Sequence, residues 1–170
     1  DGLNPAVRDL AVLMITLSDN IAANLLIDRI GMSQINSELQ AMGMKHTVLQ
    51  RKMMDSQAKE RGLDNYTSAG DMQKLMKAIL ESSFRGDILD ILFRQQCNNK
   101  LPALMEGGVR FAHKTGDLPG VEHDAGIICT DDREIIAIVL TDELADNREG
   151  IWLNQEIGKL INSELIREMQ

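Results

Sequence analysis

Apolar residues recur three and four positions apart along the first part of the chain, which is the spacing of amphipathic helices. Asn4 followed by Pro5 is typical of a helix start, and the apolar pattern of this first helix ends before Ser18. A second apolar run ends at Gly31, a residue type that commonly terminates helices. The stretch TLSDNIAANLL, Thr16–Leu26, therefore joins two predicted helices through a Ser-Asp-Asn triplet.

Three more helices are predicted further along the chain. Ser33 is expected to cap a short one, and Ser68 with Asp71 forms a capping pattern before a clearly amphipathic one. The third covers about 87–96. The charged segment 44–67 has little periodicity and is longer than an ordinary connection, and such long irregular segments in compact domains are often functional.

The period then changes from that of helices to that of strands. Three short stretches rich in β-branched and aromatic residues, VRFAHKTG, HDAGIICT and REIIAIVLTD, predict three strands in an antiparallel meander. A closing helix is predicted from about Asn147 to Met169, and Trp152 is expected to pack it onto the sheet. The predicted apolar face of this helix consists of Ile151, Ile157, Leu160, Ile161 and Leu165.

This order of elements predicts an α+β fold, because helices are followed by a meander and then by a covering helix. We expect residues 1–170 to form a single domain, with a helical lobe over about 1–100 and the strands and final helix over about 108–170. The 170 residues, 44% of them hydrophobic, are enough for a real core. Three strands are few for such a sheet, so further strands are expected from outside this sequence.

Composition excludes several classes of function. The formal net charge of -8 and the scattered Lys and Arg residues argue against a nucleic-acid partner. No apolar run approaches the roughly 20 residues that span a bilayer, so we expect no membrane insertion. Cys97 and Cys129 lie far apart and the three histidines are scattered, so neither a metal site nor a cofactor is expected.

Two triplets are candidates for chemistry. Ser18-Asp19-Asn20 has two sound interpretations, a helix cap in which Ser18 closes the following helix, or one half of an active site. Lys114-Thr115-Gly116 ends a predicted strand, where a cation, a hydroxyl and a glycine suit a carboxylate-bearing ligand. Alternation along that strand points His113 away from the side of Lys114. Either triplet alone is a weak signal, but the pair in this order is far more specific.

With their surroundings, the two triplets resemble the penicillin-recognising serine hydrolases, specifically class A β-lactamases. VRDLAVLMITLSDNIAANLLIDRIG is similar to the central helices and Ser-Asp-Asn loop of that family, and FAHKTGDLPGVEHDAGIICT is similar to its Lys-Thr-Gly strand and the next strand. The resemblance covers nearly the whole chain. It implies acyl transfer through a serine acyl-enzyme on β-lactams or D-alanyl peptides, and an extracytoplasmic bacterial protein.

The resemblance also implies roles for single residues on the first triplet. Ser18 would pass a proton to the departing amide nitrogen, and Asn20 would hydrogen-bond the acylamino side chain of the substrate. Asp19 would brace the loop from behind.

On the second triplet, Lys114 would raise the positive potential and bond to Ser18. Thr115 would bind the substrate carboxylate and Gly116 would give clearance. The backbone N–H of Asp117 would supply one oxyanion donor, worth about 3 to 4 kcal/mol of barrier.

One departure from the family pattern concerns the nucleophile, which the family carries in a Ser-x-x-Lys motif well before Ser-Asp-Asn. Only 17 residues precede Ser18 and none fits this motif, so the nucleophile is expected outside this chain, which is then inactive alone. Ser56-Gln57-Ala58-Lys59 matches in letters, but it follows Ser-Asp-Asn and lies in the irregular segment, where a solvated loop is the favoured interpretation.

A second departure concerns the loop glutamate that activates the deacylating water in the family. Met53 holds the comparable position, with Asp55 nearby, and Arg51 is expected to keep its structural role in the loop. Asp55 could act as the base, but an exposed carboxylate or a helix cap is the favoured interpretation. Without a base, an acyl-enzyme would persist.

A non-enzymatic alternative stays open. The same fold could serve as a binding or assembly module that pairs an exposed sheet edge with a second copy or with a missing amino-terminal segment. On this hypothesis, the chain is expected to dimerise.

Overall fold

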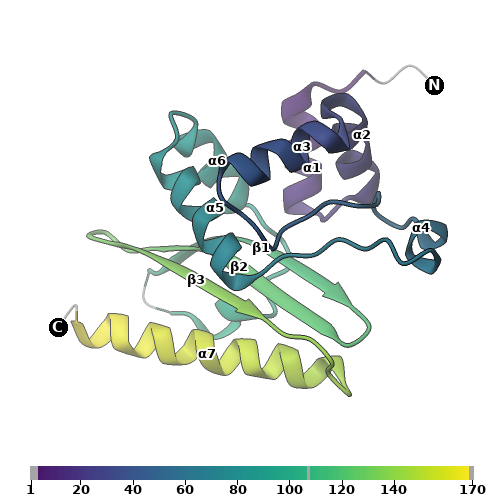
Figure 1. Ribbon diagram of the computed structural model, residues 1–170. Coiled ribbons are helices and arrows are strands. Elements are labelled where there is room, and N and C mark those ends of the chain that lie inside the picture. The colour runs from purple at the N-terminus through teal and green to yellow at the C-terminus, as the bar shows by residue number, and fades with distance from the viewer. Residues whose placement is uncertain (1–3, 107, 169–170) are drawn as a thin grey trace. The chain divides into compact units, whose positions relative to one another are not determined.

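The computed structural model describes residues 4–106 and 108–168, and it divides the chain into two compact units, Asp1–Arg85 and Gly86–Gln170 (Figure 1). The first unit contains α1 (Val7–Thr16), α2 (Asn20–Ile30), α3 (Met32–Ala41), α4 (Ser56–Glu60) and α5 (Ala69–Glu81). The second unit begins with α6 (Arg85–Leu92), which starts at the boundary. It also contains η1 (Leu101–Leu104), β1 (Arg110–Leu118), β2 (Val121–Cys129), β3 (Glu134–Leu140) and α7 (Asn147–Glu168).

In the first unit, α1 packs against α2 through a small apolar core formed by Leu10, Met14, Ala22 and Leu26. The predicted start at Asn4-Pro5 is wrong by two residues, because Ala6 is the residue that precedes the helix. The Ala6 N–H donates to Asp9 Oδ2, at 3.0 Å, so an acidic side chain in the first turn satisfies this end of α1.

The Ser33 cap is also wrong, whereas the Ser68 cap is confirmed. Gly31 has φ of 90° and lies between α2 and α3, so the chain turns within one residue and Ser33 is already inside α3. Ser68 Oγ accepts from Asp71 N at 3.2 Å, as the capping pattern predicts. The Asp71 side chain is buried and accepts instead from His46 N, at 2.6 Å.

In the second unit, the three strands form an antiparallel sheet in the order β1-β2-β3, so the predicted meander is confirmed. Its core includes Leu101, Phe111, Ile128, Ala137 and Leu165, where η1 and α7 cover the sheet. Figure 1 shows α7 running along one face of the sheet. The predicted α+β class, with a three-stranded meander and a covering carboxy-terminal helix, is thereby confirmed.

Two predictions about α7 are wrong. Trp152 is 61% exposed and does not pack the helix onto the sheet, and Leu160 is 65% exposed and does not belong to the buried face. The helix faces its unit with Gly150 and Gly158, at which an added Cβ would lie 2.8 Å from Glu122 Cβ and 2.0 Å from Leu101 O. Trp152 follows Gly150 by two residues, and Leu160 follows Gly158 by two. Two residues turn an α-helix by more than half a turn, so Trp152 and Leu160 lie on the side away from the glycines.

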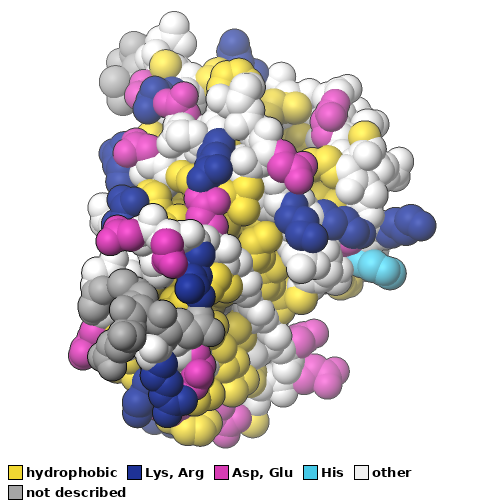
Figure 2. Space-filling model, turned by 90° about the vertical axis from the view of Figure 1, so that its left-hand side faces the viewer, with side chains coloured by type: hydrophobic (Ala, Val, Ile, Leu, Met, Phe, Trp, Pro, Cys, Tyr) yellow, Lys and Arg dark blue, Asp and Glu magenta, His cyan; other side chains and the backbone are white. Residues whose placement is uncertain are grey.

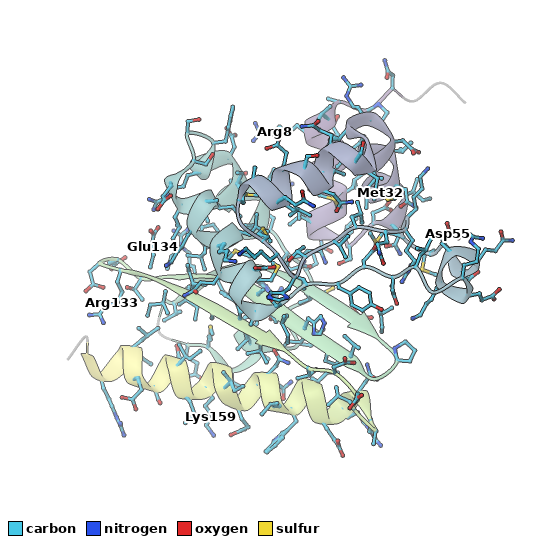
Figure 3. All side chains as sticks on the ribbon, viewed as in Figure 1. Arg8, Met32, Asp55, Arg133, Glu134 and Lys159 are labelled. Atoms are coloured by element: carbon cyan, nitrogen blue, oxygen red, sulfur yellow. The ribbon has the colours of Figure 1, made fainter. Side chains whose placement is uncertain are left out.

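The outer side of α7 also carries Lys159, which is labelled in Figure 3 and is exposed. Met169, the predicted helix end, lies outside the described residues.

Candidate active site

The Ser-Asp-Asn triplet lies at the junction of α1 and α2. Asp19 is the N-cap of α2, and its Oδ1 accepts from Ala22 N at 2.7 Å. A cap formed by Ser18, one of the two interpretations of the triplet, is wrong, because the N-cap of α2 is Asp19. Ser18 is half-buried and Asn20 begins the helix at an exposed position. The helix therefore uses Asp19 for its cap.

Ser18 has φ of 54°, one of three positive values among the described non-glycine residues. Such a conformation costs an L-residue roughly 1 to 2 kcal/mol and persists only where the surroundings impose it. Here the Asp19 cap and a bond from Asp19 N to Leu13 O, at 3.2 Å, hold both sides of the turn. Stored strain of this kind occurs often at functional sites, which favours the active-site interpretation of the triplet.

The Lys-Thr-Gly triplet lies within β1 and alternates across the sheet. Lys114 and Gly116 share one face, while Thr115 lies on the other face with His113, as alternation predicted for His113. Thr115 is only 5% exposed. His113 is buried, and its Nδ1 lies 2.7 Å from Asp124 Oδ1. The carboxylate contact expected of Thr115 stays a prediction.

Lys114 is half-buried, and its Nζ donates to Thr115 O. Burial lowers the pKa of Lys114 below the ordinary value of lysine, while the neighbouring Cys97 and Asp117 act in the opposite direction. The ammonium is therefore easier to deprotonate than that of a solvated lysine.

The structure defines the two halves of the candidate site separately. Ser18, Asp19 and Asn20 belong to the first unit, and Lys114 to Asp117 belong to the second. In the second half, Thr115 lies on the opposite face of the sheet from Lys114 and Gly116. The bond between Lys114 and Ser18 stays a prediction.

The predicted irregular segment is a closed loop. An isolated antiparallel bridge joins Val48 to Tyr66, with the two N–H···O bonds at 3.0 and 3.1 Å. Arg51 Nε donates to Asp64 Oδ1 at 2.8 Å across the loop. The pKa of Asp64 is lowered below its usual range, mainly by a hydrogen bond from the Asn65 backbone and further by the hydrogen bond from Arg51.

Two helical asparagines that the sequence analysis missed anchor this loop. Asn24 of α2 donates to Met53 O at 3.1 Å and accepts from Met53 N at 2.8 Å. Asn36 of α3 bonds both polar groups of Leu49 in the same way, at 2.8 Å each. Asparagine is unfavourable inside helices, and its presence there is the signal that could have pointed to such a tertiary role.

Asp55 caps α4 within the loop, because its Oδ1 accepts from Ala58 N at 2.9 Å. The favoured interpretation of Asp55 as a helix cap is thus confirmed. Figure 3 shows Asp55 beside this short helix. Ser56 and Lys59 lie on α4 rather than in irregular chain, so that expectation is wrong, but both are exposed, as expected for a solvated segment.

The described part of the chain adds two general findings. Among residues 4–106 and 108–168, no three His, Cys, Asp or Glu side chains are grouped so that they could hold a metal ion. Within the same ranges, every helix is too short or too polar to cross a bilayer. On the face shown in Figure 2, Lys and Arg side chains are interspersed with Asp and Glu.

The chain belongs to the β-lactamase enzyme family, whose sequence model matches residues 1–165. It is similar to the β-lactamase from Sphaerobacter thermophilus, with 32% identity and a TM-score of 0.82 over 94% of this chain and 63% of that one. It is also similar to PBP-A, with 31% identity and a TM-score of 0.82 over 96% of this chain and 62% of that one.

A variant of PBP-A determined as an acyl-enzyme complex with penicillin G matches with 30% identity and a TM-score of 0.84, over 96% of this chain and 62% of that one. The chain thus spans less than two thirds of the length of these structures. A comparison with curated protein sequences gives no match.

Proposed function

We propose that the protein containing this chain is a serine hydrolase that transfers the acyl group of a β-lactam or D-alanyl peptide to a serine. Family membership together with the two triplets, one in a strained turn and one in β1, supports this function. PBP-A, 30% identical in the variant concerned, forms an acyl-enzyme with penicillin G. The observation that carries the proposal is the strained, Asp19-capped turn that presents Ser18.

In this proposal, Ser18 returns a proton to the leaving amide nitrogen, and Asn20 holds the acylamino side chain of the substrate. Lys114 supplies positive charge to the site, and Thr115 binds the substrate carboxylate. Gly116 leaves room for the ligand. The N–H of Asp117 stabilises the oxyanion that forms during acylation.

The nucleophilic serine is proposed to lie outside these 170 residues. Ser56 and Lys59 both have exposed side chains on a five-residue helix, which argues against them as a nucleophile and its base. The chain alone is expected to be inactive.

Hydrolysis of the acyl-enzyme is proposed to be slow. The Asp55 carboxylate is engaged as the cap of α4, and the backbone of Met53 is tied to Asn24 on both sides. A general base must reach a water molecule, and neither residue offers a carboxylate prepared for that task. The covalent intermediate should therefore accumulate.

The test is intact-mass spectrometry of the protein expressed from its complete reading frame after mixing with penicillin G. A covalent adduct is expected, also in Ser56→Ala, whose serine has no assigned role. Nitrocefin hydrolysis should be slow in both. The absence of both an adduct and nitrocefin turnover would leave the proposal without support.

A second candidate function is an assembly module. In the described sheet, β3 has one neighbouring strand, and all of its residues except Glu134 are apolar. An apolar outer strand favours pairing with another strand, from a second copy or from a missing segment. Light scattering on the purified chain tests this candidate, which predicts a dimer and is contradicted by a stable monomer.

The location is proposed to be extracytoplasmic, as the family resemblance implies. Cell fractionation of the source bacterium, with the protein detected by antibody, is the corresponding measurement.

A further inference from the structure

Lys100 is a buried cation that none of the proposed roles uses. Its side chain is 3% exposed, and Nζ lies 2.6 Å from Oε2 of the buried Glu122. The same Nζ donates to the backbone carbonyls of Gly116, at 2.9 Å, and His123, at 3.1 Å. Gly116 and His123 face each other in the β1–β2 register. The Lys100 ammonium therefore contacts β1 at Gly116, the last residue of the Lys-Thr-Gly triplet, and contacts β2 at the residue opposite.

The chain segment around Lys100 is fixed on every side. Its neighbours each take part in a hydrogen bond: Asn98 with His113 at 3.1 Å, Asn99 with Gln155 at 2.9 Å, and Leu101 with Asp124 at 3.2 Å. Gly158 lets α7 approach the Leu101 carbonyl, where any larger residue would clash with backbone. A long side chain on such a segment has little freedom, so its Nζ is held in one place.

The counterion of Lys100 is fixed equally well. Glu122 Oε1 accepts from Asn147 Nδ2 at 2.7 Å, and the Glu122 backbone exchanges hydrogen bonds with Thr141 at 2.6 and 3.0 Å. Gly150 leaves room for the Glu122 side chain beneath α7. A buried ion pair of this kind needs additional hydrogen bonds, and here the two strand carbonyls supply them for the ammonium.

The bond to the Gly116 carbonyl has a geometric consequence for the next residue. Gly116 C=O and Asp117 N–H belong to one planar peptide group, and the described peptides are all trans. In a trans peptide the N–H points opposite to the C=O. Because the carbonyl points toward Lys100, the Asp117 N–H points away from Lys100. Asp117 itself is an exposed residue of β1.

The charge of Lys100 also affects the strength of that donor. A hydrogen bond from a cation to a carbonyl is stronger than a neutral one and polarises the peptide, which makes its N–H a better donor. An oxyanion donor is effective when it is preorganised and strongly polar. The contact between Lys100 and Gly116 contributes to both properties, and the pairing of Gly116 with His123 in the sheet also holds the peptide.

We propose that Lys100 is a positioning residue of the acyl-transfer site, which orients and polarises the Gly116–Asp117 peptide so that the Asp117 N–H binds the oxyanion. This inference rests on the proposed function. A purely structural ion pair would need only Glu122. Lys100 instead directs two of its three contacts at paired backbone carbonyls, that of Gly116, which directly follows Thr115, and that of His123 on β2.

The test variant is Lys100→Met with Glu122→Gln in the complete protein. Removing Lys100 alone would leave a buried carboxylate without a partner, whereas the added Glu122→Gln change removes that charge and keeps an acceptor for Asn147. Should the pair fail to fold, Lys100→Met with Glu122→Met gives a fully apolar replacement. The control is Arg148→Met with Asp146→Asn, which removes an exposed ion pair from the same unit.

Two measurements are made on each folded variant. The acylation rate constant at saturating penicillin G is expected to fall about tenfold or more, with less than a twofold change in the concentration for half-saturation. The ¹H–¹⁵N resonance of Asp117 is expected to move upfield in the proton dimension. The control should change neither quantity.

An unchanged acylation rate and an unchanged Asp117 resonance would overturn the role of Lys100. A wild type that forms no adduct would contradict the proposed function itself. In that case the Asp117 resonance still decides the inference about the peptide, because an unmoved resonance contradicts it and a shifted one supports it.

Discussion

Asp19 holds the turn that presents Ser18, because its carboxylate accepts the Ala22 N–H. Asp19→Ala should lower the free energy of unfolding by about 1 kcal/mol, the typical value of an N-cap. Asp19→Asn keeps an acceptor at the same position and serves as the control. Urea unfolding of the three proteins checks this, and an Asp19→Ala variant as stable as wild type would show that another group caps α2.

We expect the acylation rate to depend on pH through the charge of Lys114. Burial lowers its pKa, so the ammonium is lost at a lower pH than in a solvated lysine. The acylation rate should therefore fall as pH rises through a midpoint below the ordinary lysine value. Lys114→Arg should remove this alkaline limb, since arginine stays charged. A limb of equal position in both proteins would assign the titration to another group.

The same shift has a consequence for stability, with the opposite sign. Between the pKa of Lys114 in the folded protein and the ordinary value, the unfolded chain binds more protons. The contribution of Lys114 to stability therefore rises with pH across that window. This rise should be absent from Lys114→Met in urea unfolding at several alkaline pH values.

At the scale of elements, the loop between Val48 and Tyr66 depends on α2 and α3 for its shape. Asn24→Ala removes both bonds to Met53 and leaves two backbone groups unpaired, which should destabilise the loop by about 1 to 3 kcal/mol. Hydrogen exchange should become faster over residues 48–66 while α1 stays protected. Gln34→Ala, which removes an exposed bond to Glu38, is the control. Equal exchange in both variants would contradict the anchoring role.

The close approach of α7 to η1 depends on Gly158. Gly158→Ala would place Cβ 2.0 Å from Leu101 O, so it should destabilise the protein by about 3 kcal/mol or more. Gly70→Ala in α5 meets no atom within 4 Å and should instead stabilise it by up to about 1 kcal/mol. Thermal unfolding of both variants is the measurement, and equal effects would contradict the described contact.

These elements also show what the sequence could predict. Periodicity identified α1, α2, α5 and the three strands, because each of them has a local apolar pattern. It misplaced Trp152 because a helix that docks through Gly150 and Gly158 buries its small residues. It also missed Asn24 and Asn36, since their partners lie 29 and 13 residues away and no local pattern reports such bonds.

For the whole molecule, the two triplets could be recognised from sequence because each is contiguous. Lys100 could not, since its role depends on the register between β1 and β2 and on a turn that brings it under Gly116. The same is true of the Asp19 cap, which neighbouring Ser18 could equally have formed by its residue type.

The chain matches the β-lactamase family over residues 1–165 but spans only about 63% of the Sphaerobacter thermophilus enzyme. We therefore predict that the protein from the complete reading frame transfers the acyl group of a β-lactam to a serine. Intact-mass spectrometry over a time course with penicillin G tests it most directly. We predict a single adduct that forms and persists for much longer than it takes to form. A mass that stays that of the free protein at every time, with no nitrocefin turnover, would contradict acyl transfer to a serine of this protein.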